Sequence, residues 1–259
     1  MSKSVSGCIV TFNNIKTIDS ALSSVITNTK LPLKLFVVDN GSTDGTAEFI
    51  EKNYPDVTLI RSEKNIGFGA GHNTVLPFLD SDYHAIINPD IVIKDDIMSV
   101  MAEYLDKDDT VGLLSPEIRF PDGRMQILGK KKPYPHYLAA SRLRSGNNIN
   151  NILRSYAMLN RDLTVPFDIQ NATGCFMFIR TSLFKQIGGF DERYFLYFED
   201  CDLTREVNRL SRCLYFPGAV VYHEWGRESK KNTRLALIQM QSMFKYYLKW
   251  TFKKDKIKK

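Results

Sequence analysis

The first hundred residues alternate two kinds of hydrophobic pattern. Short runs of consecutive apolar residues are typical of strands buried on both faces, and apolar residues spaced three to four apart are typical of helices that cover such strands. The predicted strands are Val5–Phe12, Leu33–Val38, Val57–Ile60 and Tyr83–Ile87. The predicted helices are Thr17–Asn28, a segment from Ser42 or Thr43 to Asn53, Ala70–Phe78 and Asp95–Leu105. This alternation predicts an α/β fold with a mostly parallel, doubly wound, Rossmann-like sheet.

The second half of the chain is less regular and contains no internal repeat. Pro116–Asp122, followed by Gly123, indicates a turn that leads out of a strand. Lys130–Pro166 is basic and weakly periodic, so we interpret it as a mobile loop or a small helical insertion, which could act as a lid. The remaining predicted strands are Gly174–Ile179, Cys213–Phe216 and Ala219–Tyr222, and the remaining helices are Asp200–Leu210 and an amphipathic Arg234–Phe252.

Three polar clusters follow the predicted strands of the first half. They are Thr11-Phe12-Asn13-Asn14, Asp39-Asn40-Gly41-Ser42 and Asn88-Pro89-Asp90. Ligands of doubly wound sheets bind beyond the carboxyl ends of the strands, so these clusters are candidate binding residues. Asp39 could accept a hydrogen bond from a pyrimidine ring N–H, but its segment is equally typical of a turn with a helix cap. Asp90 could bind a divalent cation that neutralises a diphosphate, or it could belong to a capped turn.

Residues 65–73 form a glycine-rich loop at the start of a helix. Glycines let the backbone approach a ligand, and a helix N-terminus favours phosphate. The spacing is G-x-G-x-G rather than the G-x-G-x-x-G of dinucleotide sites, which disfavours NAD binding.

Three acids, Glu199, Asp200 and Asp202, stand within four residues and follow a run of aromatic residues. Acids stabilise a helix N-terminus, which could explain Asp200 or Asp202 without any chemistry. A carboxylate in this partly apolar setting could alternatively serve as a general base. His223 is a lone histidine of the kind that is more often structural, but next to a metal-binding carboxylate it could be a second ligand.

Composition and charge narrow the class of protein. The 259 residues are 43% apolar and 25% charged, without a run of about 18 apolar residues or a secretory signal, so we expect a cytoplasmic, globular protein. The four cysteines form no C-x-x-C pair, which indicates reduced thiols. The net charge of +6 is concentrated between Lys245 and Lys259, where Asp255 is the only acid. Such a tail can contact an anionic membrane, while no nucleic-acid-binding fold accompanies it.

Together, these segments resemble the bacterial family 2 glycosyltransferases of the GT-A fold, and most closely their rhamnosyltransferase-like branch. The resemblance covers about residues 5–225 and depends on the order and spacing of five elements. They are Ile9–Asn13, Val37–Ser42, Asn65–Gly69, Asn88–Asp90, and Gly174–Met177 leading to Gly188–Asp191 and Glu199–Leu203. The resemblance implies a GT-A catalytic domain over residues 1–228, followed by a basic amphipathic helix and tail over residues 229–259.

The resemblance also implies roles for individual residues. Asp200 matches the catalytic base, and Asp90 is the surviving acid of a D-x-D motif whose first acid is replaced by Asn88. Mg²⁺ or Mn²⁺ would then depend on Asp90, the diphosphate and His223. The implied donor-nucleotide residues are Thr11, Asn13, Asp39, Asn40, Asn65, Gly67, Asn73 and Asn88. The implied acceptor and sugar pocket contains Gly174, Glu199 and Trp225.

The implied reaction is an inverting sugar transfer from a nucleotide-sugar donor to a hydroxyl of a glycan or lipid-linked glycan. dTDP-L-rhamnose is the expected donor, and UDP-hexoses are the alternative because both pyrimidines present the same N–H to Asp39. We expect the protein at the inner face of the cell membrane, although the C-terminal helix could simply pack on the domain. Two other hypotheses are a non-catalytic nucleotide-binding scaffold and a nucleotidyltransferase. The second is disfavoured because Thr11–Lys16 holds one lysine and no glycine.

Overall fold

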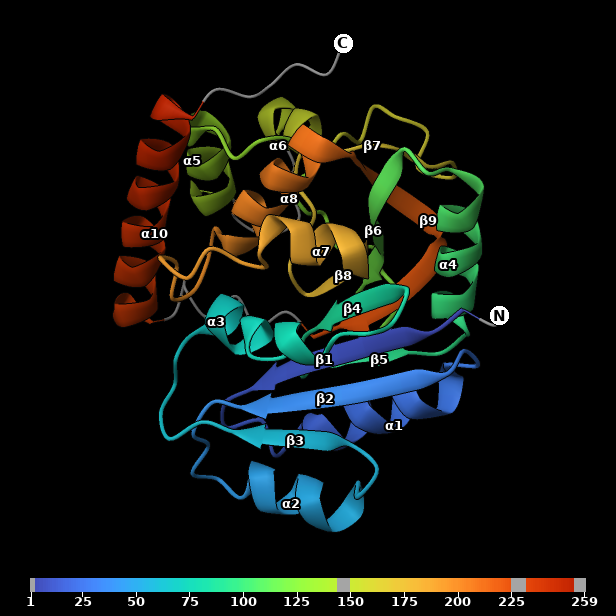
Figure 1. The fold of residues 1–259 in the computed structure, drawn as a ribbon. Coiled ribbons are helices and arrows are strands. Elements are labelled where there is room, and N and C mark those ends of the chain that lie inside the picture. The colour runs from blue at the N-terminus through green and yellow to red at the C-terminus, as the bar shows by residue number, and fades with distance from the viewer. Residues whose placement is uncertain (1–2, 144–149, 225–231, 254–259) are drawn as a thin grey trace.

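The computed structural model describes residues 3–143, 150–224 and 232–253. Within these ranges, one mixed sheet of nine strands forms the centre of the molecule (Figure 1). Its order is β3-β2-β1-β4-β8-β6-β9-β5, and β7 pairs with β9 beside this path. The strands are β1 (Val5–Thr11), β2 (Leu33–Asp39), β3 (Thr58–Arg61), β4 (Tyr83–Ile87), β5 (Ile91–Ile93), β6 (Val111–Arg119), β7 (Phe167–Asp168), β8 (Phe176–Arg180) and β9 (Arg212–His223).

The first four strands confirm the predicted parallel arrangement. β1 pairs in parallel with β2 and β4, and β2 with β3. Strands β6 and β9 run in the same direction as these four, while β5, β7 and β8 run antiparallel to their neighbours. The sheet is therefore mostly parallel, with its exceptions in the second half of the chain.

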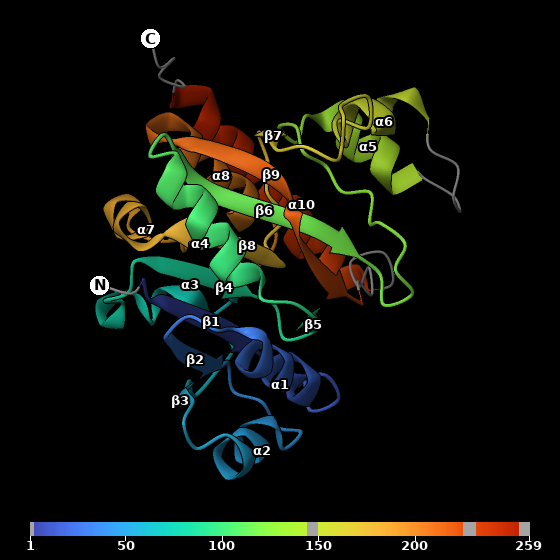
Figure 2. The same cartoon turned by 90° about the vertical axis from the view of Figure 1, so that its right-hand side faces the viewer.

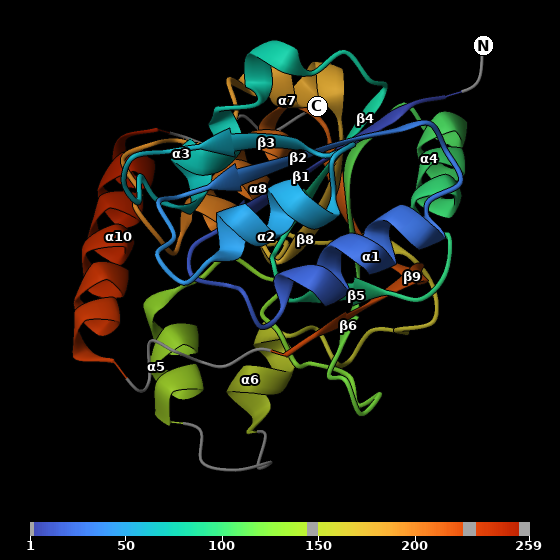
Figure 3. The same cartoon turned by 90° about the horizontal axis from the view of Figure 1, so that it is seen from below.

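The helices cover both faces of the sheet because both faces of its central strands are apolar. On β1, Val5 and Ile9 pack with α1 and α4, whereas Cys8 and Val10 pack with α7 and α8. Figure 3 shows α1 and α2 on one side of the first strands and α3 and α7 on the other, and Figure 2 shows α4 against β6. The helices are α1 (Ile18–Asn28), α2 (Thr46–Asn53), α3 (Phe68–Asn73), the 3₁₀ helix η1 (Leu76–Phe78), α4 (Ile97–Lys107), α5 (Pro135–Leu143), α6 (Asn151–Tyr156), α7 (Thr181–Ile187), α8 (Glu199–Leu210) and α10 (Thr233–Phe252).

Several predicted boundaries are wrong for local reasons. Helix α2 begins at Thr46 after a left-handed Gly45, because the Ser42 hydroxyl instead accepts a hydrogen bond from the Asn13 N–H at 2.9 Å. The helix predicted over Ala70–Phe78 is divided into α3 and η1, with a proline in the first turn of η1. The two strands predicted over 213–222 are one strand, β9, with a register shift against β6. The side chain of Asp96 caps α4 by accepting a hydrogen bond from the Ser99 N–H.

The weakly periodic segment 130–166 contains two helices in its described part, which favours the helical-insertion interpretation. Helix α5 packs against α6, and the rings of Tyr137 and Tyr156 stack with centroids 4.8 Å apart. The backbone N–H of Lys130 donates to the Tyr156 carbonyl at 2.9 Å, which holds the start of the segment against the end of α6. The lid hypothesis stays a prediction.

Helix α10 lies along the side of the molecule next to α5 and α8 (Figure 1). Its inner face buries Tyr246 and Trp250 against Tyr194 and Phe198. None of the helices in the described ranges is long and apolar enough to span a membrane. The predicted boundary between residues 228 and 229 falls in 225–231, outside the described residues.

Candidate active site

Polar residues at the ends of β2, β1 and β4 stand side by side because of the strand register. Thr11, the last residue of β1, pairs with Asp39, the last residue of β2. Asn88 follows β4 on the other side of β1, and its N–H donates to the Cys175 carbonyl at 2.9 Å. Gly174 therefore continues the row into the start of β8, and its N–H donates to Asp200 Oδ2 at 3.0 Å. The structure thus joins the predicted nucleotide residues to the predicted base.

Asp39 has one engaged and one unengaged carboxylate oxygen. Its side chain is 3% exposed, and Oδ2 accepts from the Ser42 N–H at 3.0 Å. Oδ1 is buried and has no hydrogen-bond partner within the described residues. A buried carboxylate oxygen without a partner is costly, so this atom is a candidate acceptor for a ligand N–H.

Asn40 and Asn65 hold the glycine-rich loop rather than opening it to a ligand. The Asn40 amide donates to the Gly67 carbonyl at 3.0 Å, and Asn65 Oδ1 accepts from the Gly67 N–H at 2.9 Å. A Cβ on Gly67 would lie 2.4 Å from the Phe195 carbonyl oxygen, and φ at Gly67 is +97°. Gly67 is therefore required for close packing of the loop on the chain that precedes α8.

Two other predicted nucleotide residues also serve as connections between loops. Asn73 exchanges two 2.8 Å hydrogen bonds with the backbone of Phe190, so its amide is directed at that segment. Asn13 has a left-handed backbone, with φ of +58°, and its Oδ1 accepts from the Thr43 N–H at 2.8 Å. Asn13 thereby connects the loops after β1 and β2, next to Asp39.

Asp90 and His223 are brought together by the pairing of β5 with β9. Ile91 pairs with His223, and Asp90 Oδ2 lies 3.3 Å from His223 Nε2. A carboxylate oxygen and an imidazole nitrogen form a donor pair that fits a divalent cation such as Mn²⁺. Within the described residues no group of three His, Cys, Asp or Glu side chains is placed to hold a metal. Further ligands would therefore have to come from substrate or water.

A cavity of about 190 Å³ opens beside Asp90 and is also lined by Lys16 and Lys94. The ammonium group of Lys94 lies 3.8 Å from the centre of the Tyr222 ring. Sequence analysis missed Lys16 as a candidate site residue. Lys16 lies between the end of β1, which is part of the candidate site, and the start of α1. Phosphates bind beyond the carboxyl ends of strands and at helix N-termini, so this position could have identified Lys16 from the sequence.

Asp200 occupies the first turn of α8, where its carboxylate is held in place. Oδ2 accepts from Gly174 N–H, Oδ1 accepts from the Cys201 N–H at 2.7 Å, and a Cβ on Gly174 would lie 3.1 Å from Asp200 Cβ. Burial raises the pKa of Asp200, against the opposing effect of these hydrogen bonds. Burial, together with the Asp200 charge, also raises the pKa of Glu199. A positioned carboxylate with a raised pKa has the properties of a general base.

The chain that leads into α8 has an unusual backbone. Tyr197 and Phe198 both have φ of +68°, in the left-handed region that non-glycine residues rarely adopt. Such conformations cost about 1–3 kcal/mol each and occur where the surrounding structure holds them in place. Here the Ser242 hydroxyl of α10 donates to the Leu196 carbonyl at 2.8 Å. Helix α10 thus supports the segment that positions Asp200.

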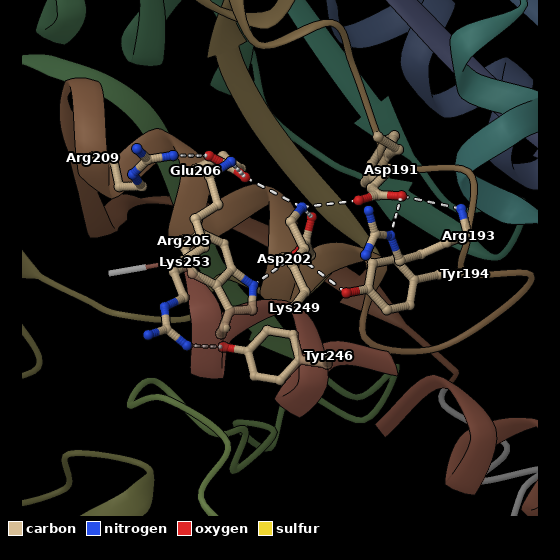
Figure 4. Close-up of polar contacts among 12 residues, drawn as sticks. Asp191, Arg193, Tyr194, Asp202, Arg205, Glu206, Arg209, Tyr246, Lys249 and Lys253 are labelled. Atoms are coloured by element: carbon tan, nitrogen blue, oxygen red, sulfur yellow. Dashed lines mark hydrogen bonds and ion pairs between the residues drawn. The ribbon is translucent and has the colours of Figure 1, made fainter. Parts of the chain in front are cut away.

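Asp202 belongs to a network of polar contacts that attaches α10 to α8 (Figure 4). Its carboxylate accepts from Lys249 Nζ at 2.6 Å and from Trp250 Nε1 at 2.7 Å. Lys249 also donates to Asp191 at 2.9 Å. Burial would lower the pKa of Lys249, but hydrogen bonds to Asp202 and Asp191 outweigh this effect and raise it. Glu206 Oε1 also lies 3.2 Å from Lys249 Nζ, so the ammonium group stays charged among three carboxylates.

Trp225, predicted for the acceptor pocket, lies outside the described residues. Glu199 is 5% exposed, and its Oε2 atom is buried without a partner in the part of the chain that the structure describes. The burial of Glu199 places it beneath the candidate site rather than on its surface.

Comparison with known proteins identifies the family of the chain. The family model described as glycosyl transferase family 2 matches residues 6–188. N-acetylglucosaminyl-diphospho-decaprenol L-rhamnosyltransferase of Mycobacterium tuberculosis is 28% identical over 236 residues, covering 83% of this chain and 74% of that protein. Rhamnosyltransferase WbbL of Escherichia coli is 22% identical over 202 residues, covering 72% of this chain and 69% of that protein.

Solved structures show the same fold. Staphylococcus aureus TarS in complex with UDP has a TM-score of 0.61 at 19% identity, covering 92% of this chain and 65% of that chain. Mannosyltransferase PcManGT from Pyrobaculum calidifontis, in complex with GDP-Man and Mn²⁺, has a TM-score of 0.63 at 19% identity, covering 95% and 65%. This chain therefore spans about two thirds of the length of those two chains. These similarities confirm the GT-A fold, and the family match over most of its length shows that the chain belongs to glycosyl transferase family 2.

Proposed function

We propose that this protein transfers a sugar, with inversion, from a pyrimidine nucleoside diphosphate sugar to a hydroxyl group of a glycan acceptor. The observation that carries the proposal is the row from Asp39 through Thr11 and Asn88 to Gly174 and Asp200. At one end of the row, Asp39 Oδ1 has no hydrogen-bond partner among the residues that the structure describes. At the other end, two backbone N–H groups hold the Asp200 carboxylate in place. A nucleobase N–H would bind Asp39 Oδ1, and the reacting sugar would then lie toward Asp200.

The proposed chemistry is a single displacement. Asp200 removes the proton from the acceptor hydroxyl, and the hydroxyl oxygen attacks the anomeric carbon opposite the departing nucleoside diphosphate. The bond to the diphosphate oxygen breaks as the new glycosidic bond forms, so the configuration inverts. Asp90 and His223 would hold a divalent cation, which supplies charge neutralisation for the leaving diphosphate. Lys16, on the same cavity as Asp90, would add positive charge there.

We propose dTDP-L-rhamnose as the donor and a lipid-linked glycan as the acceptor. The names of the relatives from M. tuberculosis and E. coli support rhamnose, and the first of these names also includes a diphospho-decaprenol acceptor. A UDP-hexose is the second candidate, because Asp39 would meet the same N–H in both pyrimidines.

We also propose that α10 rests on an anionic membrane. Its outer face carries five large apolar side chains that are more than half exposed: Leu237, Met240, Phe244, Leu248 and Phe252. They recur at helical spacing opposite the packed face, and exposed apolar stripes of this kind mark interaction surfaces. The net charge of +6 favours an anionic partner. In vesicle flotation, wild type should float with anionic vesicles and Phe244→Glu should not. Equal flotation of the two proteins would reject this surface.

The donor proposal is tested by thermal unfolding with dTDP, UDP, GDP and NAD, each with and without Mn²⁺. A ligand at a hundredfold excess over its Kd stabilises the native state by about 2.7 kcal/mol. We expect a Mn²⁺-dependent increase with dTDP or UDP that is lost in Asp90→Ala. Absence of a shift with either pyrimidine nucleotide would reject a pyrimidine nucleotide donor, whereas a shift without sugar transfer in the product analysis would support the scaffold hypothesis. Product analysis with dTDP-L-rhamnose and UDP-hexoses then identifies the sugar.

A further inference from the structure

Gln126 occupies a buried position between the end of β6 and the end of β9. The chain turns after β6, with the Phe120 N–H donating to the Arg124 carbonyl at 2.8 Å, and returns beside its own strand. The Gln126 N–H donates to the Ile118 carbonyl at 2.8 Å, which fixes the backbone of Gln126. Its side chain is 2% exposed and contacts His223. A buried amide needs a partner for each polar atom, so the orientation of this side chain is restricted.

The neighbours of Gln126 determine which end of its amide faces which group. Nε2 lies 2.5 Å from the His223 carbonyl oxygen and 3.4 Å from the Arg119 carbonyl oxygen. Carbonyl oxygens only accept hydrogen bonds, so the amide nitrogen must be the atom that faces them. The amide oxygen Oε1 therefore faces His223 Nδ1, at 3.3 Å.

This orientation decides the tautomer of the His223 ring. Oε1 of Gln126 only accepts, so a hydrogen bond with His223 Nδ1 requires the ring proton to be on Nδ1. In a neutral imidazole the lone pair is then on Nε2, the atom that lies 3.3 Å from Asp90 Oδ2. Two electron-pair donors facing each other at this distance repel unless a cation is shared between them. The arrangement is thus suited to hold a positive ion.

We propose that Gln126 is a positioning residue that orients His223 as a metal ligand, by accepting a hydrogen bond from Nδ1–H and leaving the Nε2 lone pair beside Asp90. This inference depends on the proposed function for its cation, but Gln126 itself touches neither substrate nor metal. Metal-binding histidines commonly donate their other ring N–H to such a partner, and loss of that partner typically weakens metal binding about 10–100-fold.

Three variants separate this role from simple packing. Gln126→Met keeps a similar volume but cannot accept a hydrogen bond from the ring, so the ring proton should move to Nε2, where Asp90 can accept a hydrogen bond from it. Gln126→Glu retains an acceptor opposite Nδ1 and, when protonated on its other oxygen, still donates to the His223 carbonyl, so it should keep the wild-type tautomer. Asn171→Leu is the matched control. Asn171 is also a buried amide, and it donates to the carbonyl of Gly129, three residues after Gln126, at 3.0 Å rather than to His223.

The first readout is the tautomer of His223, measured by two-bond ¹⁵N–¹H correlation of the histidine rings in the metal-free full-length protein and assigned with His223→Gln. We expect Nδ1–H in wild type, Gln126→Glu and Asn171→Leu, and Nε2–H in Gln126→Met. Nε2–H in the wild-type protein would overturn the inference whatever the metal result.

The second readout is the Kd for Mn²⁺ in the presence of dTDP or UDP, measured by electron paramagnetic resonance. We expect Gln126→Met to weaken Mn²⁺ binding about 10–100-fold, with Asn171→Leu close to wild type. If wild type binds Mn²⁺ but Gln126→Met binds it equally well, the role of Gln126 is wrong and the metal site stands. If wild type binds no Mn²⁺ with either nucleotide, the metal site and this inference both fail, while nucleotide binding alone still tests the transferase proposal.

Discussion

The two halves of the candidate site are assembled in different ways. In the first half, Thr11 and Asp39 each end a buried strand, Asn88 follows the next one, and parallel pairing alone makes them neighbours. In the second half, Asp200 and His223 reach the same region through an antiparallel strand, a left-handed segment and support from a helix about forty residues later in the chain. The first half depends on local pattern, and the second depends on long-range contacts.

Because of this difference, substitutions far from the candidate site should affect its second half more than its first. Helix α10 supports residues 191–198, the Phe195 carbonyl of that segment accepts from the Phe68 N–H, and the neighbouring Gly67 is held by Asn40. A continuous set of contacts therefore connects the C-terminal helix to the loop beside Asp39. Destabilising α10 should therefore displace Asp200 far more than the nucleotide residues Asp39 and Thr11. Strand pairing in the sheet also holds those two residues in place.

The largest effect should come from the base itself. In Asp200→Asn the acceptor hydroxyl loses its proton acceptor, so we expect kcat to fall about 10²–10⁴-fold. The Kd for dTDP or UDP should stay near that of wild type, because Asp39 is unchanged. Transfer assays and calorimetry on the same preparation measure both quantities. A kcat within threefold of wild type would assign the chemistry to another residue and remove the second half from the site.

The next largest effect tests the attachment of α10. Lys249→Met removes the cation shared by Asp191, Asp202 and Glu206, whose side chains are 21%, 2% and 14% exposed. Breaking a buried ion pair on one side typically costs about 3–5 kcal/mol. Urea unfolding should show a loss of this size. Lys253→Met is the control, since the Lys253 side chain is 41% exposed and its partner Glu206 keeps Lys249 as a second cation, so the loss should be less than about 1 kcal/mol. Equal losses in the two variants would contradict the special role of Lys249.

A third experiment addresses the first half of the site. Asp39→Asn keeps the shape of the side chain but removes its negative charge. A hydrogen bond to a charged group contributes about 1.5–3 kcal/mol, so pyrimidine nucleotide affinity should fall roughly 10–100-fold. Isothermal titration calorimetry with dTDP and UDP measures the loss. Glu48→Gln, an exposed acid on the neighbouring α2, should bind like wild type, and unchanged binding by Asp39→Asn would reject Asp39 as the base-recognition residue.

The smallest expected effect is a pH dependence of stability from Glu199. Burial raises the pKa of Glu199 in the folded protein, so the folded state holds this proton more tightly than the unfolded state. The resulting stability is fully present below the unfolded pKa and is lost as pH rises through the folded pKa. Thermal unfolding from pH 4 to pH 8 should therefore show Glu199→Gln gaining on wild type as pH increases. Parallel curves for the two proteins would mean that Glu199 is not buried in its protonated form.

The accuracy of sequence-based prediction follows the same division between the two halves. Strands β1 to β4 were predicted within a residue or two, because buried parallel strands have nearly continuous apolar runs. Asp39 and Asp90 were identified because they follow such runs directly. Strands β5 and β7 were missed, since three or two residues carry no periodicity that can be recognised. The glycine-rich loop was interpreted as facing a ligand, whereas Gly67 is required by the Phe195 backbone, which no local pattern reveals.

The sequence by itself determined the fold class, the family and the identity of the candidate chemical groups, because these depend on strand periodicity and on short motifs in a fixed order. Only the tertiary structure decided how the groups are oriented. The contact of His223 with Asp90, the direction of the Gln126 amide and the attachment of Asp202 to Lys249 all join residues far apart in the chain. Hydrogen-bond direction and burial depend on every neighbour in space, and the linear order of residues does not specify those neighbours.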